Sequence, residues 1–105
     1  LPARTTEILE RRDAEWLNPA ATNLLEVMSS MAYPRAALLA EAQADFTVIV
    51  EFAPDGSVQH AYPAIGSFDR FGLGRSAAVT ARRLKVDPAP GRAFTSCMAV
   101  SFRIS

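Results

Sequence analysis

The sequence predicts an α+β fold, in which a three-stranded antiparallel sheet carries a crossover helix on one face and two extra helices precede it. Two segments, 46–52 and 94–104, alternate apolar and polar residues with the period of two that is typical of half-buried strands. A Pro-Asp-Gly turn follows the first of them at 54–56 and predicts a hairpin. Between the hairpin and the last strand, residues 73–84 repeat apolar side chains at helical spacing.

Length and charge limit the classes of function. The chain has 105 residues and a formal net charge of zero, which predicts one modest core and argues against a general nucleic-acid partner. It contains no apolar run of the roughly 20 residues that span a bilayer. Because the chain begins with Leu1, we expect a processed or excised piece, and removal of a signal peptide or membrane anchor is compatible with this start.

The first thirty residues predict two helices. Leu1–Leu17 is read as a weak amphipathic helix, and Asn18 is a good N-cap for a second helix from Pro19 to about Met28. We interpret residues 1–31 as an N-terminal helical extension and residues 32–105 as a second unit.

An apolar stripe in this extension has two readings. Trp16 and the stripe formed by Leu24, Leu25, Met28 and Met31 can bind a partner, but such a stripe is more often a core contact. We expect core.

The second unit begins at Tyr33-Pro34, because proline disfavours α conformation before it and suits a first helical turn after it. A short helix, Arg35–Ala42, follows. The hairpin returns through Ser57–Tyr62, and the crossover helix begins at Leu73 and ends before Asp87-Pro88.

A hairpin followed by a helical crossover places the third strand beside the first, which gives the sheet order 2-1-3. The third strand is then a sheet edge with unpaired backbone groups that have to be covered or used. Such an edge can accept an extended peptide as an added strand, or pair with a second copy in a homodimer.

The motifs from Tyr33 onward resemble the C-terminal domain of TonB-type energy transducers. That family shows Y-P-x-x-A, a short helix, an alternating strand and P-D-G-x-V, which Tyr33-Pro34, Ala37 and Pro54–Val58 match in type and spacing. In its later helix, Leu73, Ala77, Arg82-Arg83 and Pro88 also match in place. Leu84 and Val86 stand where the family usually has Trp and Phe, and Ala44 where it has Gly.

The resemblance implies a periplasmic protein that grips the TonB-box peptide of outer-membrane receptors through its third strand. The domain would pass on energy from an inner-membrane motor complex for uptake of siderophores, haem or cobalamin. It would be connected to that complex through an N-terminal anchor that is missing from this sequence. Tyr33 and Pro34 would form a second contact. The docking strand would consist of eight residues: Thr95, Ser96, Cys97, Met98, Ala99, Val100, Ser101 and Phe102.

Little in the sequence indicates catalysis, a metal or a cofactor. His60 is the only histidine and Cys97 the only cysteine, and neither has a motif for nucleophilic chemistry or metal binding around it. We expect His60 at the surface and interpret Arg82-Arg83 as a solvated helix face, with an acidic partner as the alternative.

Two other functions remain open. One is a structural TonB-like or TolA-like module of an envelope assembly, whose edge strand is occupied by its own helices or another subunit. The other is an accessory domain of an enzyme or sensor. An accessible third strand favours energy transduction, and a permanently covered one favours the structural role.

Overall fold

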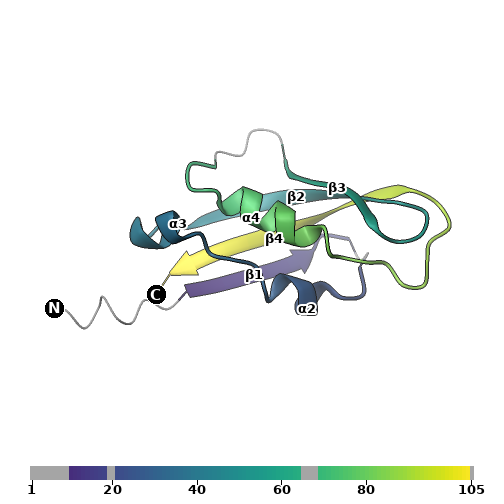
Figure 1. The fold of residues 1–105 in the computed structure, drawn as a ribbon, viewed down its shortest axis with the longest axis horizontal. Helices are drawn as coiled ribbons and strands as arrows, with labels where there is room; N and C mark the ends of the chain where they lie inside the picture. The colour runs from purple at the N-terminus through teal and green to yellow at the C-terminus, as the bar shows by residue number, and fades with distance from the viewer. Residues whose placement is uncertain (1–9, 19–20, 65–68, 105) are drawn as a thin grey trace.

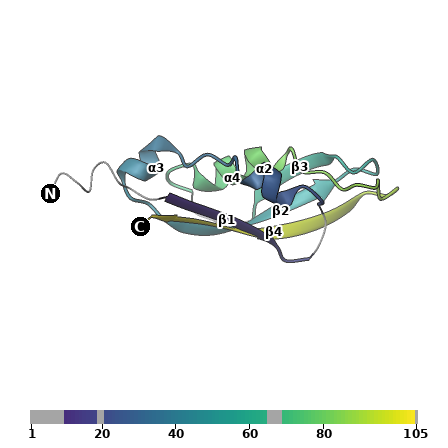
Figure 2. The ribbon, with the colours of Figure 1, turned by 90° about the horizontal axis from the view of Figure 1, so that it is seen from below.

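The computed structural model describes residues 10–18, 21–64 and 69–104, which form one antiparallel sheet with helices on one of its faces (Figure 1 and Figure 2). The sheet has four strands in the order β1-β4-β2-β3. The elements are β1 (Glu10–Trp16), α2 (Leu24–Met28), α3 (Arg35–Leu39), β2 (Ala44–Phe52), β3 (Val58–Pro63), α4 (Leu73–Ala81) and β4 (Phe94–Ile104). The predicted α+β class with an antiparallel sheet is confirmed.

The core lies between the sheet and α4, as the alternating strands predict. Every second residue of β2 and β4 points toward the helices, and full burial of each large aliphatic or aromatic side chain among them contributes about 1.5–3 kcal/mol. The side chains with no solvent exposure on this face are Val48, Val50, Phe52, Met98, Val100 and Phe102.

Helix α4 lies close to the sheet because its inner face is built from small residues. Ala77 and Ala81 have no solvent exposure. A Cβ added at Gly74 would lie 2.9 Å from the ring of Phe46, so even a methyl group is too large there.

The turn between β2 and β3 joins the hairpin to the segment after α4. The carboxylate of Asp55 accepts hydrogen bonds from the backbone N–H (2.9 Å) and hydroxyl (2.6 Å) of Ser57. Gly56 has φ +91°, and its carbonyl accepts a hydrogen bond from the Val86 N–H at 2.9 Å. A Cβ at Gly56 would lie 2.1 Å from the Val86 carbonyl oxygen.

The prediction of a three-stranded sheet was wrong because the sheet has a fourth strand, β1. β3, β2 and β4 have the predicted relative order 2-1-3, but β1 pairs with β4 from Glu10 opposite Ile104 to Trp16 opposite Met98. The third strand of the prediction is therefore an interior strand and not an edge.

Both predicted N-terminal helices need correction. Residues 10–16 form a strand instead of the end of a helix, because pairing with β4 satisfies more backbone groups than a short, weakly amphipathic helix can. The predicted part over 1–9 lies outside the described residues. The second helix is shorter than predicted, at Leu24–Met28, and Pro19, its expected first residue, also lies outside them.

The stripe in this region is mainly core, as predicted. Met28 and Met31 are buried, Leu24 is half-buried against the core, and Leu25 is 83% exposed. In the described parts of the chain, no helix is long and apolar enough to span a bilayer.

The substitution Gly56→Ala should destabilise the fold more than Gly91→Ala. Both glycines have positive φ, but an added Cβ meets nothing within 4 Å at Gly91 and meets the Val86 carbonyl at Gly56. Strain alone costs about 1–2 kcal/mol at each site, and the clash adds to it only at Gly56. Urea unfolding of both variants measures the difference in the free energy of unfolding. Equal losses of stability would show that the turn does not hold Gly56 this close to the Val86 carbonyl.

Candidate functional site

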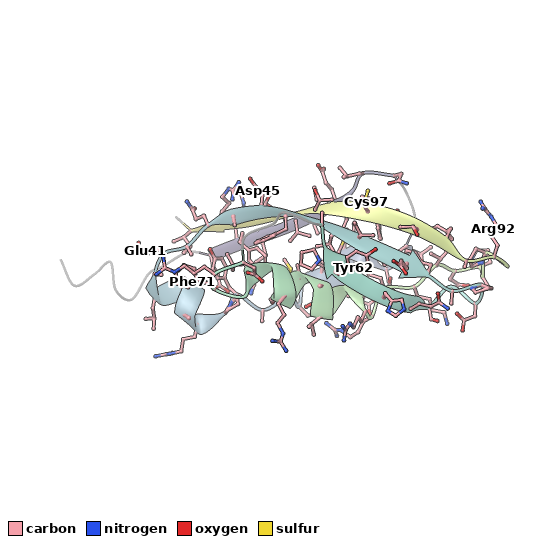
Figure 3. All side chains as sticks on the ribbon, turned by 90° about the horizontal axis from the view of Figure 1, so that it is seen from above. Glu41, Asp45, Tyr62, Phe71, Arg92 and Cys97 are labelled. Carbon is pink, nitrogen blue, oxygen red and sulfur yellow. The ribbon has the colours of Figure 1, made fainter. Side chains whose placement is uncertain are left out.

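The eight residues predicted to bind a partner do lie together on one strand, β4. Ser96, Met98, Val100 and Phe102 are buried toward the helices. The other four, Thr95, Cys97, Ala99 and Ser101, lie on the open face of the sheet. Figure 3 shows Cys97, together with Asp45 of β2, on the side away from α3 and α4.

The backbone groups of β4 are divided between its two neighbours. The Leu17 N–H donates to the Cys97 carbonyl at 3.2 Å, so the groups of Cys97 point toward β1. Because successive residues of a strand point in opposite directions, Ala99, Ser101 and Arg103 also point toward β1, and the even-numbered residues point toward β2. An added peptide would need the groups that β1 now occupies.

Strand β1 is held mainly through its backbone. Of its seven side chains, four are exposed, and Ala14 and Trp16 are the apolar ones that pack against the core. Its two ion pairs, Arg11–Asp13 at 2.9 Å and Arg12–Glu10 at 3.0 Å, are internal to β1. Among the described residues, no ion pair joins β1 to β4. The Arg11–Asp13 pair is exposed, and exposed ion pairs contribute little to stability.

Trp16 is the largest side chain that β1 places in the sheet. Its ring lies 6.2 Å from the ring of Phe52, which stacks in turn on Phe94 at 5.1 Å. The indole Nε1 is buried and has no hydrogen-bond partner among the residues that the structure describes. A buried donor without an acceptor costs about 1–3 kcal/mol, which reduces what Trp16 contributes to holding β1.

Tyr33 lies behind the candidate docking strand and not at the surface. It is buried, its ring meets Phe102 of β4 edge-on at 5.2 Å, and its hydroxyl donates to the Ala42 carbonyl. Burial raises the pKa of Tyr33, and the charge of Glu10 raises it further, whereas Arg103 acts in the opposite direction. Tyr33 therefore supports β4 from within the core.

Pro34, the other predicted second contact, is half-buried and occupies the N-cap position of α3. Its role in binding a partner stays a prediction, as does that of Tyr33.

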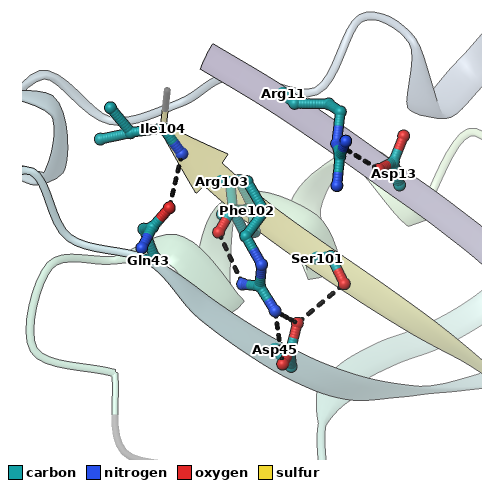
Figure 4. Close-up of polar contacts among 8 residues, drawn as sticks. All are labelled: Arg11, Asp13, Gln43, Asp45, Ser101, Phe102, Arg103 and Ile104. Carbon is teal, nitrogen blue, oxygen red and sulfur yellow. Dashed lines mark hydrogen bonds and ion pairs between the residues drawn. The ribbon is translucent and has the colours of Figure 1, made fainter. Parts of the chain in front are cut away.

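A polar cluster on the open face was not predicted from the sequence. Arg103 of β4 donates to both carboxylate oxygens of Asp45 on β2, at 2.6 and 2.8 Å, and Ser101 donates to the same carboxylate at 2.8 Å (Figure 4). These hydrogen bonds, first from Arg103 and then from Ser101, lower the pKa of Asp45. The sequence indicated only that these residues face outward on their strands. It did not indicate the register between β2 and β4, which brings them together.

The structure places the remaining candidate residues on three different parts of the fold. His60 is exposed on β3, Arg82 and Arg83 are exposed after α4, and the Arg83 guanidinium contacts the Ser30 hydroxyl. Cys97 is half-buried, with its Sγ 3.8 Å from Asn18 Oδ1. The described residues contain no group of three His, Cys, Asp or Glu side chains that could hold a metal ion.

Comparison with known proteins gave no match, either to a family model or to a curated protein.

The Asp45 contact should give a pH-dependent contribution to stability. Because its pKa in the folded state lies below the ordinary 3.8, the charged carboxylate stabilises the fold above that pH and the contribution is lost as pH falls through the folded-state pKa. Asp45→Asn should therefore lower the free energy of unfolding near neutral pH by at most about 1 kcal/mol, since the pair is exposed.

Denaturant unfolding of both proteins at several pH values measures this difference. It should shrink in acid, and Asp13→Asn, which removes an ion pair within β1 alone, is the matched control. A difference independent of pH would mean that the charge of Asp45 does not stabilise the β2–β4 pair.

Proposed function

We propose that this chain is a non-enzymatic protein-binding domain of the bacterial periplasm that acts as TonB-type domains do. In this proposal β4 receives the TonB-box peptide of an outer-membrane receptor as an added strand, along Thr95–Phe102. The domain then transmits energy from an inner-membrane motor complex for uptake of siderophores, haem or cobalamin. The observation that carries the proposal is that β4 already pairs, along its outer side, with a short strand contributed by a separate segment.

The pairing of β1 supports strand addition because it occurs on the side of β4 where a peptide would bind. A peptide would have to use the backbone groups of Cys97, Ala99, Ser101 and Arg103, which β1 and Leu17 now face. Each main-chain hydrogen bond formed there contributes about 0.5–1.5 kcal/mol net. A partner strand of similar length would replace these bonds one for one.

A partner has to compete with β1, and this sets a condition on its affinity. A tethered strand acts at an effective concentration on the order of millimolar, so a free peptide with the same intrinsic affinity displaces it only at that concentration. Displacement at a lower peptide concentration requires that β1 pairs only weakly with β4. Three features favour that condition. Most side chains of β1 are exposed, and within the described residues β1 has no ion pair to β4 and the Trp16 Nε1 has no acceptor.

The covered edge also favours a second function. If β1 stays in place, the chain is a structural TonB-like or TolA-like module of an envelope assembly, with the edge of β4 filled by its own N-terminal segment. The continuous register of β1 along β4 is the observation that supports this alternative.

The substitution Glu15→Pro in the full chain separates these two functions. Glu15 lies opposite Ala99, is exposed, and its N–H points toward β4 by the alternation that begins at Leu17. Proline removes that donor and releases β1, whereas Glu15→Ala removes the same side chain and keeps the donor. We expect Glu15→Pro to bind peptides from the N-termini of outer-membrane receptors at least tenfold more tightly than Glu15→Ala.

Amide shifts in isotope-labelled protein measure the affinity and should be concentrated in 95–102. Unchanged spectra of β2, β3 and α4 before peptide is added would show that the proline variant keeps its fold. If neither variant shows shifts at millimolar peptide, the transducer function is overturned and the structural alternative stands.

A further inference from the structure

We propose that the side of β4 now covered by β1 selects extended segments that run antiparallel to β4. The preferred six-residue motif has an acidic residue at its first position, a branched aliphatic residue at its fourth and phenylalanine at its sixth. The three selected positions are those that Arg11, Ala14 and Trp16 occupy in β1. The inference rests on the proposed function in taking β4 as the receiving strand. It follows from three places where β1 fits its neighbours in the fold poorly.

The first poor fit is a pair of like charges. Arg11 lies directly opposite Arg103 on the open face, and like charges in that relation destabilise an antiparallel pair. Each arginine has turned to a carboxylate on its own side, Arg11 to Asp13 and Arg103 to Asp45 (Figure 4). A segment with Asp or Glu at this position would place opposite charges across the junction.

The second poor fit is a hollow beside Ala14. The space between β1 and α2 has a volume of about 150 Å³ and is lined by Ala14, Leu24, Leu25 and Met28 together with Arg12, Asp13 and Ser29. The methyl group of Ala14 does not fill it. Valine or isoleucine at this position would bury added apolar surface there, and both side chains suit a strand.

The third poor fit is the indole of Trp16. The ring contact with Phe52 holds the aromatic body in the sheet, but the buried Nε1 finds no acceptor within residues 10–18, 21–64 and 69–104. Phenylalanine keeps an aromatic ring against Phe52 and has no donor to leave unpaired. All three defects belong to the pairing of β1 with β4, Arg11 on the open face and Ala14 and Trp16 on the face toward the core, so a segment that corrects them competes well against β1.

Hydrogen exchange in the full chain tests the three positions without any partner. The N–H groups of Ala99, Ser101 and Arg103 point toward β1 and report its release, while those of Met98 and Val100 point toward β2 and serve as the internal control. Ala14→Val should slow exchange of the reporting amides several-fold. Trp16→Phe should slow it or leave it unchanged, and Trp16→Ala should speed it at least tenfold.

Arg11→Glu needs a matched background because Arg11 also pairs with Asp13. In Asp13→Asn protein, adding Arg11→Glu should slow exchange of the same amides roughly twofold to fivefold, since one cross-strand charge pair has a modest effect. Slower exchange at Ala99, Ser101 and Arg103 with no change at Met98 and Val100 is the expected result. Unchanged or faster exchange in both Ala14→Val and Arg11→Glu would overturn the inference.

Peptides test the same positions in a partner. An eight-residue peptide with the sequence of residues 10–17 is compared, on Glu15→Pro protein, with one that carries Glu, Val and Phe at the positions of Arg11, Ala14 and Trp16. The altered peptide should bind at least tenfold more tightly. Equal or weaker binding would overturn the inference even if receptor peptides bind, whereas the expected order without any receptor binding would retain it and reject the transducer function. If no peptide binds, the exchange measurements decide.

Discussion

The antiparallel ladder between β2 and β4 is the interaction on which the other parts of this structure depend. It runs through nine residue pairs, from Ala44 opposite Phe102 to Phe52 opposite Phe94, and six of its inner side chains have no solvent exposure. β3 extends it through the hairpin, and α4 covers it with alanine. On the opposite face, the Asp45–Arg103 contact joins the same two strands, and Tyr33 meets β4 from the core.

This ladder leaves one side of β4 in need of a partner, and the chain supplies that partner itself. An unpaired strand next to a large buried ladder would expose a straight row of backbone donors and acceptors. β1 satisfies them with a sequence that is mostly charged, and its exposed charges also protect the new edge of the sheet from pairing with other chains. The same solution makes β1 a weaker neighbour than β2, because few of its side chains reach the core.

The sequence was informative wherever a strong period was present. The alternation from Phe46 to Phe52 and from Phe94 to Ile104 predicted both long strands and the face each one buries, and the glycine of the turn marked the hairpin. Strand β1 gave no comparable signal, because five of its seven residues are charged and only Ala14 and Trp16 alternate as a strand requires. Its conformation comes from pairing with a segment more than eighty positions later, which no local pattern contains.

The candidate site was predictable only in part for the same reason. The residues of β4, their two faces and the neighbour β2 were predicted, but the second neighbour, β1, was not. The Asp45–Arg103 pair depends on the register between β2 and β4, and register is set by the fit of two distant segments.

The placement of Glu10 opposite Ile104 has a mechanical consequence (Figure 1). The first residue of β1 and the end of β4 are neighbours, so tension applied between them would load the hydrogen bonds of the junction one after another. Bonds broken in succession resist less force than bonds sheared together, since each alone is worth about 0.5–1.5 kcal/mol. Pulling on the chain ahead of β1 against the end of β4 would therefore load the hydrogen bonds of the β1–β4 junction first and unzip β1 from the sheet.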